Sequence, residues 1–519
     1  MVFIKSERYP YWKISMNFEN NIISEVLNVE AYIKQQWFSN VRGDVLSGIV
    51  VALALIPEAI GFSILAGVNP MMGLYASFCI AVVISFVGGR PGMISAATGA
   101  MALVLVGLIR NHGIEYMLAA TILTGVIQIL LGFLGIGKLV KFIPRSVMTG
   151  FVNSLSILVF IAQLPYFIGE SWEMYAMVAG GLVIIYLFPK ITKAIPSPLV
   201  AILIISIIAI MTGSDVRTVG DMGDIQGTLP SFILPNVPIS LETLSIIFPY
   251  AISLALVGLI ESLLTAQILD DLTDTTSNKN LESKGQGIAN IINGLFGGMA
   301  GCALIGQSVI NVKSGGRGRL STFIAGTFLM FFIIVLNQLV VQIPLAALVS
   351  VMVFVSMSTF DWSSLKSVFK IPRTDAAVMV ITVGVVLSTH NLAIGVIVGI
   401  LLSAIFFAAK ISKVKVTSNL LDSSNTRIYY VEGQIFFASV TDFVNAIDFK
   451  DDVEIVEIDL SHAHIWDESG VSAIDKIVLK LHENGIKAKI IGLNGSSKTM
   501  IDSIGVYNKP GALKRTVNH

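Results

Sequence analysis

Two apolar runs of this chain are too short to cross a membrane, although both stand among runs of membrane-spanning length. One follows a GGxxG motif at 297–301 and ends near Val312, where a cluster of basic residues begins. At roughly ten residues it has half of the ~20 that an α-helix needs to span a bilayer. The other follows the same GGxxG spacing at 88–92. Short, glycine-interrupted segments at matching places in two halves indicate a transporter built from inverted repeats.

The composition indicates a chain that lies mostly in lipid. Hydrophobic residues make up 54% of the 519 residues and charged residues only 13%, whereas soluble chains carry about 25% charge. Lys+Arg and Asp+Glu are equal at 34 each, so there is no basic excess for nucleic acid. The two cysteines, Cys79 and Cys302, both lie in apolar runs and predict no disulfide framework. The N-terminus lacks an apolar signal core, so no cleaved signal peptide is expected.

Apolar runs follow one another from Val45 to Ala409, and we divide the chain into a leader (1–40), a transmembrane domain (41–412) and a C-terminal domain (413–519). The two repeats are expected at about 45–213 and 243–412. With the short segments at 97–110 and 302–312, the predicted spans make about fourteen segments: 45–66, 70–88, 115–136, 147–168, 173–189 and 198–213, then 243–269, 285–296, 320–341, 344–359, 374–389 and 391–412.

The charges of the loops predict the orientation. If the N-terminus is cytoplasmic, the outside loops hold only two basic residues, Arg110 and Arg217. The inside loops hold all the others, namely Arg90, Lys138, Lys141, Arg145, Lys190, Lys193, Lys279, Lys284, Lys313, Arg317, Arg319, Lys366, Lys370 and Arg373. This alternation is the positive-inside pattern, so both termini are expected in the cytoplasm of a bacterium whose plasma (inner) membrane holds the protein.

After Lys410 the pattern changes to short strands alternating with helices, which is typical of a small α/β domain. The expected strands are 427–431, 434–438, 453–460 and 488–493, and the expected helices are 469–482 and 497–504. His462 and His464 are typical of a surface pair. Ser469 opens a helix, where a serine is usually a cap, although it could also be a phosphorylation switch.

Two acids stand inside predicted spans, Glu58 in the first span of the first half and Glu261 in the first span of the second. A charge near mid-membrane costs about 2.5–3.5 kcal/mol on insertion scales and normally faces a cavity or a partner. The alternative is a structural carboxylate that caps a broken helix. Thr265 falls on the same helical face as Glu261, so this pair could hold Na⁺, or Glu261 alone could take a proton.

The short segments supply the opposite charge, because each begins with free backbone N–H groups at a positive dipole end. If the turn Thr98-Gly99-Ala100-Met101 faces the turn Ala303-Leu304-Ile305-Gly306, the gap between them could bind an anion without any arginine. Alternatively, these glycines only allow tight helix packing. Phe62, one turn beyond Glu58, could line the cavity or pack. Lys313, Arg317 and Arg319 are expected to be a positive-inside cluster rather than ligands.

These motifs make the chain resemble the SulP family of anion transporters, which includes sulfate permeases, bicarbonate transporters and exchangers related to prestin. The resemblance rests on VRGDVLSGIVVALALIPEAIGFSILAGVNPMMGLYASF, IPRSVMTGFVNSLSILV, GQGIANIINGLFGG and INVKSGGRGRL. It continues in DLSHAHIWDESGVSAID, which is similar to the STAS domain that these transporters share with anti-sigma-factor antagonists.

The resemblance implies an all-α membrane fold of fourteen segments in two inverted repeats, divided into core and gate domains, plus a cytoplasmic α/β STAS domain. It implies an elevator-type motion, a homodimer for which the STAS domain is a candidate interface, and an anion site between the third and tenth segments. The anion would lie among Thr98 to Met101 and Ala303 to Gln307, with Glu58 and Phe62 beside it. Glu261 and Thr265 match the positions that coordinate sodium in the cyanobacterial bicarbonate members.

The sequence departs from the family pattern at three places. Prestin-like exchangers carry a basic residue where this chain has Gln307, which favours a bound co-cation. The acid at 261 is Glu rather than Asp, so H⁺ stands beside Na⁺ as the coupling ion. Ser469 matches the D-x-S-G phosphorylation site of the anti-sigma-factor antagonists, but Glu468 crowds it with negative charge.

The sequence therefore predicts a secondary active transporter of a small anion such as bicarbonate, sulfate or a dicarboxylate, in symport with Na⁺ or H⁺. An uncoupled exchanger or a channel-like conductance is the alternative, and a membrane-tethered signalling protein with a STAS output is a weaker one. No nucleotide loop, triad or metal cluster predicts an enzyme or a cofactor. Membrane lipid and the small anion are the expected partners, with no nucleic acid.

Overall fold

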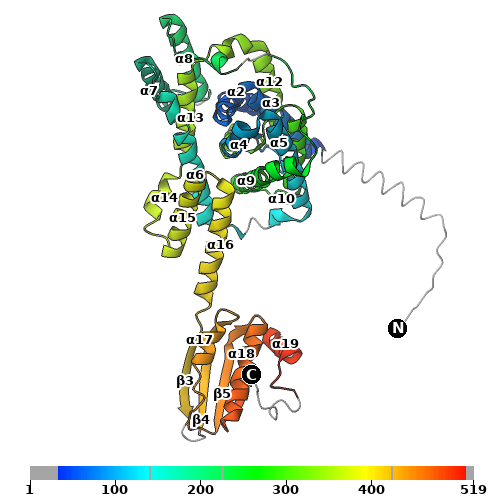
Figure 1. Ribbon diagram of the computed structural model, residues 1–519, viewed down its shortest axis with the longest axis vertical. Coiled ribbons are helices and arrows are strands. Elements are labelled where there is room, and N and C mark those ends of the chain that lie inside the picture. Colours follow the sequence, from blue (N-terminus) through cyan, green and yellow to red (C-terminus); the bar gives the residue numbers. More distant parts are fainter. Residues whose placement is uncertain (1–32, 139–141, 193–194, 224–226, 422–424, 510–519) are drawn as a thin grey trace, which may run out of the picture. The chain divides into compact units, whose positions relative to one another are not determined.

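The computed structural model describes residues 33–138, 142–192, 195–223, 227–421 and 425–509 (Figure 1). The chain divides into two compact units, Met1–Gly399 and Ile400–His519. Most of the predicted leader lies outside the described residues, as do Lys141 and Lys193 of the predicted inside loops.

The first unit is helical. Its first half holds α2 (Val41–Ala66), α3 (Pro70–Val87), α4 (Gly99–His112), α5 (Ile114–Phe133), α6 (Arg145–Ile161), α7 (Trp172–Leu187) and α8 (Ser197–Thr212). Its second half holds α9 (Leu241–Thr273), α10 (Lys279–Leu295), α11 (Ile305–Lys313), α12 (Arg319–Val341), α13 (Leu345–Thr359), α14 (Trp362–Ser367) and α15 (Arg373–Thr389), and α16 (Leu392–Ile411) passes into the second unit.

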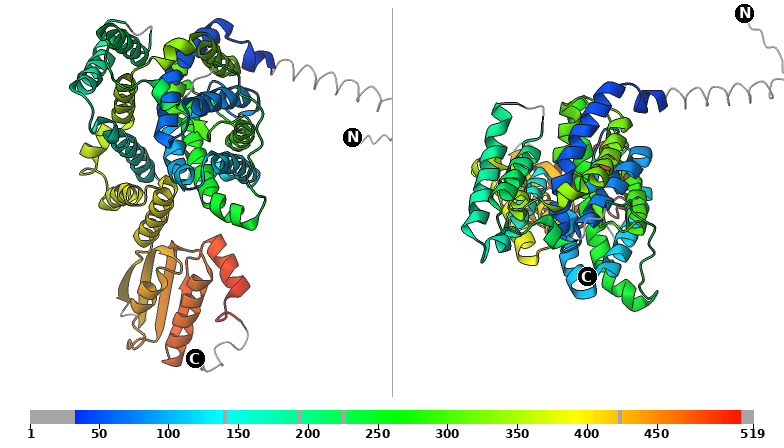
Figure 2. Two further views of the ribbon diagram at one scale, coloured as in Figure 1. Left: turned by 45° about the horizontal axis from the view of Figure 1, so that its top comes forward. Right: turned by 90° about the horizontal axis from the view of Figure 1, so that it is seen from above.

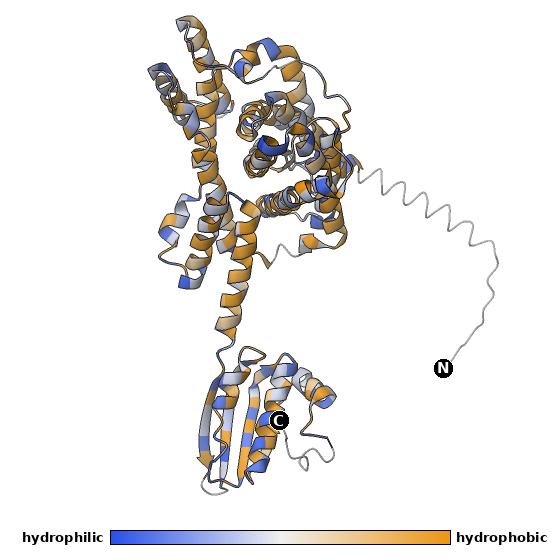
Figure 3. Ribbon diagram, viewed as in Figure 1, coloured by the Kyte–Doolittle hydropathy of each residue, from blue (hydrophilic) through white to orange (hydrophobic). Residues whose placement is uncertain are grey.

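Apolar residues run along most of these helices (Figure 3). Among the described residues, nine helices are long and apolar enough to cross a membrane, and α4 and α8 are shorter apolar helices. The membrane-type helical fold is thereby confirmed, while the total of about fourteen segments stays a prediction. α9 is longer than the predicted span 243–269, because Ser240 accepts a hydrogen bond from the Thr243 N–H and caps the helix early.

The helices of the first unit pack in two groups, which Figures 1 and 2 show apart. In the core group (α2–α5 and α9–α12), α10 packs against α3 and α5, and α12 packs against α2 and α3. In the gate group (α6–α8, α13 and α15), α13 packs against α6 and α7, and α15 packs against α6. Helices from the two halves of the sequence are thus mixed within each group, as the predicted inverted repeats require.

Glycines bring α5 and α10 together very closely. A Cβ atom on Gly125 would lie 2.4 Å from the Gly287 carbonyl oxygen, and a Cβ atom on Gly287 would lie 2.5 Å from the Gly125 carbonyl oxygen. The two backbones are therefore in direct contact, an arrangement that small residues permit between membrane helices.

Two short strands join the repeats, and the sequence did not predict them. β1 (Ser95–Ala97) pairs antiparallel with β2 (Gly301–Ala303), with Ala96 opposite Cys302. α4 begins directly after β1 and α11 directly after β2. The predicted half-helix segments 97–110 and 302–312 therefore each begin as a strand and become helical two or three residues later.

The second unit contains a four-stranded sheet in the order β3-β4-β5-β6. Its strands are β3 (Lys415–Leu421), β4 (Thr426–Ile435), β5 (Ile455–Ile465) and β6 (Lys487–Ile491), and its helices are α17 (Val440–Asn445), α18 (Glu468–Glu483) and α19 (Gly495–Ile504). β3 pairs antiparallel with β4, whereas β4, β5 and β6 are parallel. Val456, Ile458 and Leu460 of β5 are buried in its core with the apolar side of α18.

Two of the expected strands were wrong in this unit. The runs 427–431 and 434–438 form one strand, β4, which continues through Gly433 at a positive φ of 126° and ends at Ile435. β3 was missed because its residues are almost all exposed, as befits an edge strand, and so show no alternation of apolar and polar residues.

Candidate functional site

The candidate site begins with α10, whose polar side chains hold the strand pair in the core group. Gln286 donates a hydrogen bond to Ser95 Oγ of β1 at 2.8 Å. Asn290 binds both backbone groups of Gly301 in β2, each at 3.0 Å, and Asn293 donates to the Met299 carbonyl oxygen at 2.6 Å. All three side chains are buried. The sequence predicted no role for these three residues, although a polar face on a helix among apolar spans indicates buried polar contacts.

Because the two strands are antiparallel, the first turns of α4 and α11 lie at opposite ends of the strand pair, and each helix leads away from it. Thr98 caps α4 by accepting a hydrogen bond from the Met101 N–H at 3.3 Å. α11 has no side-chain cap, since Leu304 occupies the cap position. Gly306, the second residue of α11, is exposed, and a Cβ atom there would have no neighbour within 4 Å. The start of α11 therefore faces open space.

Four of the residues predicted for the anion site make contact in two pairs, Glu58 with Gln307 and Phe62 with Gly99. Gln307 donates a hydrogen bond through Nε2 to Glu58 Oε1 at 2.7 Å, although 249 positions separate the two residues. The Phe62 ring lies so close to Gly99 that a Cβ atom there would be 2.9 Å from the ring. Glu58 is half-buried and Gln307 is buried.

The other predicted anion-site residues differ in exposure. Ile305 is half-buried next to the exposed Gly306, so both can be reached. By contrast, Ala100, Met101, Ala303 and Leu304 are buried. Among the predicted anion-site residues of the two half-helices, only Ile305 and Gly306 are thus accessible in this structure.

The predicted cation-coupling acid lies beside β2. Glu261 Oε2 accepts a hydrogen bond from the Cys302 thiol at 3.1 Å, and Cys302 Sγ lies 3.4 Å from Thr98 Oγ1. A chain of contacts therefore joins Glu261 to the cap of α4. The Thr265 hydroxyl donates to the backbone carbonyl of Glu261 at 2.7 Å, which leaves its oxygen free to accept. Cys302 was noted in the sequence only as a cysteine without a disulfide partner.

The expected positive-inside cluster needs one correction, because Arg319 is buried. Its guanidinium donates to the carbonyl oxygens of Ser85 at 2.9 Å and Gly88 at 2.7 Å, at the end of α3. Lys313 and Arg317 remain exposed. A buried guanidinium that satisfies the free carbonyls of a helix end is a structural cap, and its place in a basic cluster of the sequence did not indicate this role.

A second buried charge fixes the start of α12. The Asp44 carboxylate accepts hydrogen bonds from the backbone N–H groups of Arg317 at 2.7 Å and Gly318 at 3.0 Å. Arg90 and Lys279 likewise pair with Asp270, at 3.0 and 2.6 Å. Arg319, Arg90 and Lys279, the first buried and the other two half-buried, are therefore engaged away from Glu58.

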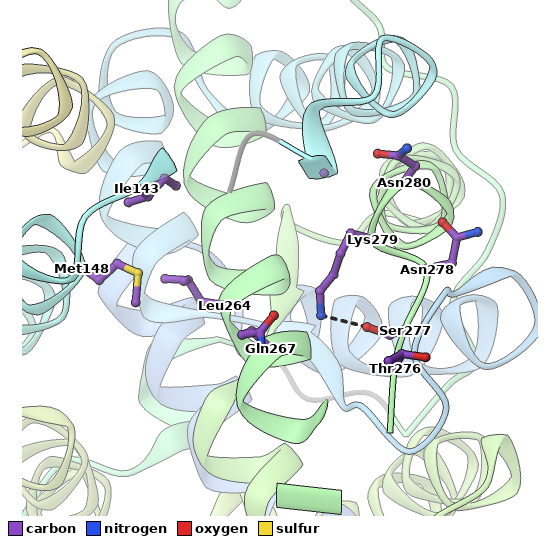
Figure 4. Close-up of a pocket in the computed structure, with 10 residues that line it drawn as sticks. Ile143, Met148, Leu264, Gln267, Thr276, Ser277, Asn278, Lys279 and Asn280 are labelled. Carbon is purple, nitrogen blue, oxygen red and sulfur yellow. Dashed lines mark hydrogen bonds between the residues drawn. The ribbon is translucent and has the colours of Figure 1, made fainter. Parts of the chain in front are cut away.

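A cleft of about 980 Å³ lies beside α9, lined by Leu264 and Gln267 of that helix, by Met148 of α6 and by the loop 276–280 (Figure 4). Lys279 points toward Ser277 at its edge, where Nζ and Oγ are 2.8 Å apart. Leu264 lies three residues beyond Glu261 in α9. The cleft thus separates a core helix from a gate helix close to the candidate cation site.

In the second unit the predicted helix cap is a different residue. Asp467, not Ser469, caps α18 by accepting a hydrogen bond from the Gly470 N–H at 2.9 Å, so Ser469 lies in the first turn, half-buried. His464 is also not a free surface residue. Its Nδ1 lies 3.1 Å from Asn494 Nδ2 and its ring lies against Trp466, while His462 is exposed.

A bundle of apolar helices in which two half-helices begin at the two ends of one strand pair is typical of secondary transporters. Comparison with known sequences gives the family. Residues 41–382 match the sulfate permease family and residues 418–519 match the STAS domain. The chain belongs to the sulfate permease family and is an integral membrane anion transporter, not an enzyme.

Individual relatives agree with this assignment. The chain is 64% identical over 475 residues to a protein of Bacillus subtilis described as a putative sulfate transporter, YbaR, covering 92% of this chain and 99% of that one. It is 26% identical to the bicarbonate transporter BicA of Picosynechococcus, covering 91% and 92%.

Solved structures show the same fold. The transmembrane domain of a cyanobacterial BicA superposes with a TM-score of 0.62 at 28% identity, covering 71% of this chain and 98% of that one. Murine Slc26a9 in the inward-facing state gives 0.79 at 16% identity, covering 98% and 96%. At that identity the second likeness shows the fold alone.

Proposed function

We propose that this protein is a secondary active transporter that moves a small inorganic or carboxylic anion inward together with Na⁺ or H⁺. The anion would occupy the open first turn of α11, and Glu261 with Thr265 would take the cation. Transport would follow an elevator-type motion of the core group against the gate group. The protein would act in the bacterial plasma membrane as a homodimer, with the STAS domain as the candidate interface and both termini in the cytoplasm.

The observation that carries this proposal is the surroundings of Glu261. This buried carboxylate has one hydrogen-bond donor among the described side chains, the weak thiol of Cys302. A charged carboxylate in such a place is costly unless a cation neutralises it. A cation at Glu261 would therefore favour an anion at the half-helix ends, because it removes the repulsion between this carboxylate and the anion.

The cleft between α9 and α6 supports the elevator motion, since it already separates a helix of each group on the predicted cytoplasmic side. We further propose the domain division at residues 41–412 and 413–519 and a regulatory role for Ser469. An uncoupled exchanger with the same anion site would transport without responding to a cation gradient, and this difference decides between the two functions.

The test is uptake into liposomes that contain the purified full chain. An imposed inward gradient of Na⁺ or of H⁺ is expected to concentrate labelled bicarbonate, sulfate or fumarate above equilibrium. Glu261→Gln should abolish this accumulation while the protein stays folded, and Glu242→Gln, at an exposed position of the same helix, should leave it intact. Cation-driven uptake that persists undiminished in Glu261→Gln would refute the coupling role.

A further inference from the structure

The pair formed by Glu58 and Gln307 is a feature of the site that coupling through Glu261 does not explain. Gln307 is the third residue of α11, so its partner Glu58 stands beside the same turn whose N–H groups would hold the anion. The Gln307 amide donates to Glu58 Oε1 at 2.7 Å. Among the described residues, no backbone N–H of α11 bonds to Glu58, so the carboxylate does not cap the helix.

The pair presents more acceptors than donors to its surroundings. The second Glu58 oxygen has no hydrogen-bond donor among the described contacts, and Gln307 Oε1 is a buried oxygen without a partner there. The Gln307 amide uses one of its two N–H groups for Glu58. An anion at the start of α11 therefore meets N–H donors on one side and a carboxylate oxygen on the other.

Among the described residues, no basic side chain bonds to Glu58 or to Gln307. Within the core group, the described buried or half-buried arginines are engaged elsewhere, Arg319 by the carbonyls at the end of α3 and Arg90 by Asp270. The residue that could have supplied a positive charge in the first turn of α11 is the amide Gln307. A bare anion beside Glu58 is thus opposed by like charge and by an unsatisfied acceptor.

We infer that the Glu58–Gln307 pair selects monovalent oxyanions that carry their own hydroxyl group, of which bicarbonate is the simplest. Its hydroxyl donates to the free Glu58 oxygen while its other two oxygens accept from the N–H groups of α11. Sulfate has no proton to offer near neutral pH and carries a second negative charge. This inference deepens the proposed function and depends on the same anion site.

Nitrate tests the contribution of the hydroxyl group alone. Like bicarbonate, it is a planar monovalent anion with three oxygens, but it has no proton to donate. In equilibrium binding to the purified full chain with its coupling cation present, nitrate and sulfate are expected to bind roughly 10- to 100-fold more weakly than bicarbonate, the range in which a missing partner for a buried acceptor falls. This comparison needs no variant. Equal binding of nitrate and bicarbonate would overturn the inference, since a Glu58 that is itself protonated would donate to both.

Glu58→Gln tests the pair directly, because an amide offers both a donor and an acceptor. Nitrate binding should strengthen at least several-fold in this variant while bicarbonate binding changes little, so that the ratio between the two anions falls toward one. Glu242→Gln should keep the wild-type ratio. A ratio unchanged in folded Glu58→Gln would refute the role of Glu58, whereas failure of every anion to bind the wild-type protein would refute the anion site itself.

Discussion

The Asn290 side chain holds β2 in place through two hydrogen bonds, and its replacement gives a quantitative prediction. Its amide oxygen accepts from the Gly301 N–H and its amide nitrogen donates to the Gly301 carbonyl, both at 3.0 Å, in a fully buried position. Asn290→Leu keeps the branched shape of the side chain but leaves both Gly301 groups without this partner. At about 1–3 kcal/mol for each orphaned buried group, the free energy of unfolding should fall by about 2–6 kcal/mol.

The lower end of that range is the better expectation in a membrane, where side-chain hydrogen bonds average about 0.6 kcal/mol because the unfolded state also finds partners. Thermal unfolding of the detergent-solubilised full chain measures the loss. Since Gly301 belongs to β2, which leads into α11, anion binding should weaken as well. Asn111→Leu, in the exposed last turn of α4, is the control. An Asn290→Leu protein with unchanged unfolding temperature and anion affinity would refute this account of β2.

Three further substitutions test other contacts of the core group. Cys302→Ala removes the thiol hydrogen bond to Glu261 and should reduce the effect of the cation on anion affinity several-fold, measured by anion titrations with and without the cation. Cys302→Ser should restore this effect of the cation, and Cys79→Ala, in α3, should leave it unchanged. Gly287→Ala places a methyl group 2.5 Å from the Gly125 carbonyl oxygen and should lower the free energy of unfolding by about 1–3 kcal/mol, measured by thermal unfolding; stability equal to wild type would contradict the close contact. Asp44→Asn weakens two charge-assisted bonds to the start of α12 and should destabilise the protein by at least about 1 kcal/mol, whereas an unchanged unfolding temperature would exclude that role.

Much of the fold could be predicted because it depends on local patterns. The lengths of the apolar runs indicated the membrane helices, and the two GGxxG motifs indicated where helices are interrupted. The acid Glu58 could be identified because a charge inside an apolar run needs a partner. Its partner Gln307 was predicted to be in the same site, but only through the family resemblance.

The remaining features depend on contacts between distant segments. β1 and β2 have three residues each, too few to show any periodicity, and they are strands only because they pair with one another. Arg319 looked like a loop charge, since its sequence neighbours are basic, yet the end of α3 needs its guanidinium. Cys302 gained a role only when folding placed its thiol between Glu261 and Thr98.

The most direct test of the central claim is the linkage between cation and anion at equilibrium. Binding of bicarbonate, sulfate and fumarate to the purified protein would be titrated with and without Na⁺ at two pH values. We expect the affinity for one anion to rise with Na⁺ or with lower pH, and the affinity for that cation to rise by the same factor with the anion. In Glu261→Gln both effects should vanish. An anion affinity that responds to neither Na⁺ nor pH in the wild-type protein would contradict coupled transport and make Glu261 a structural acid.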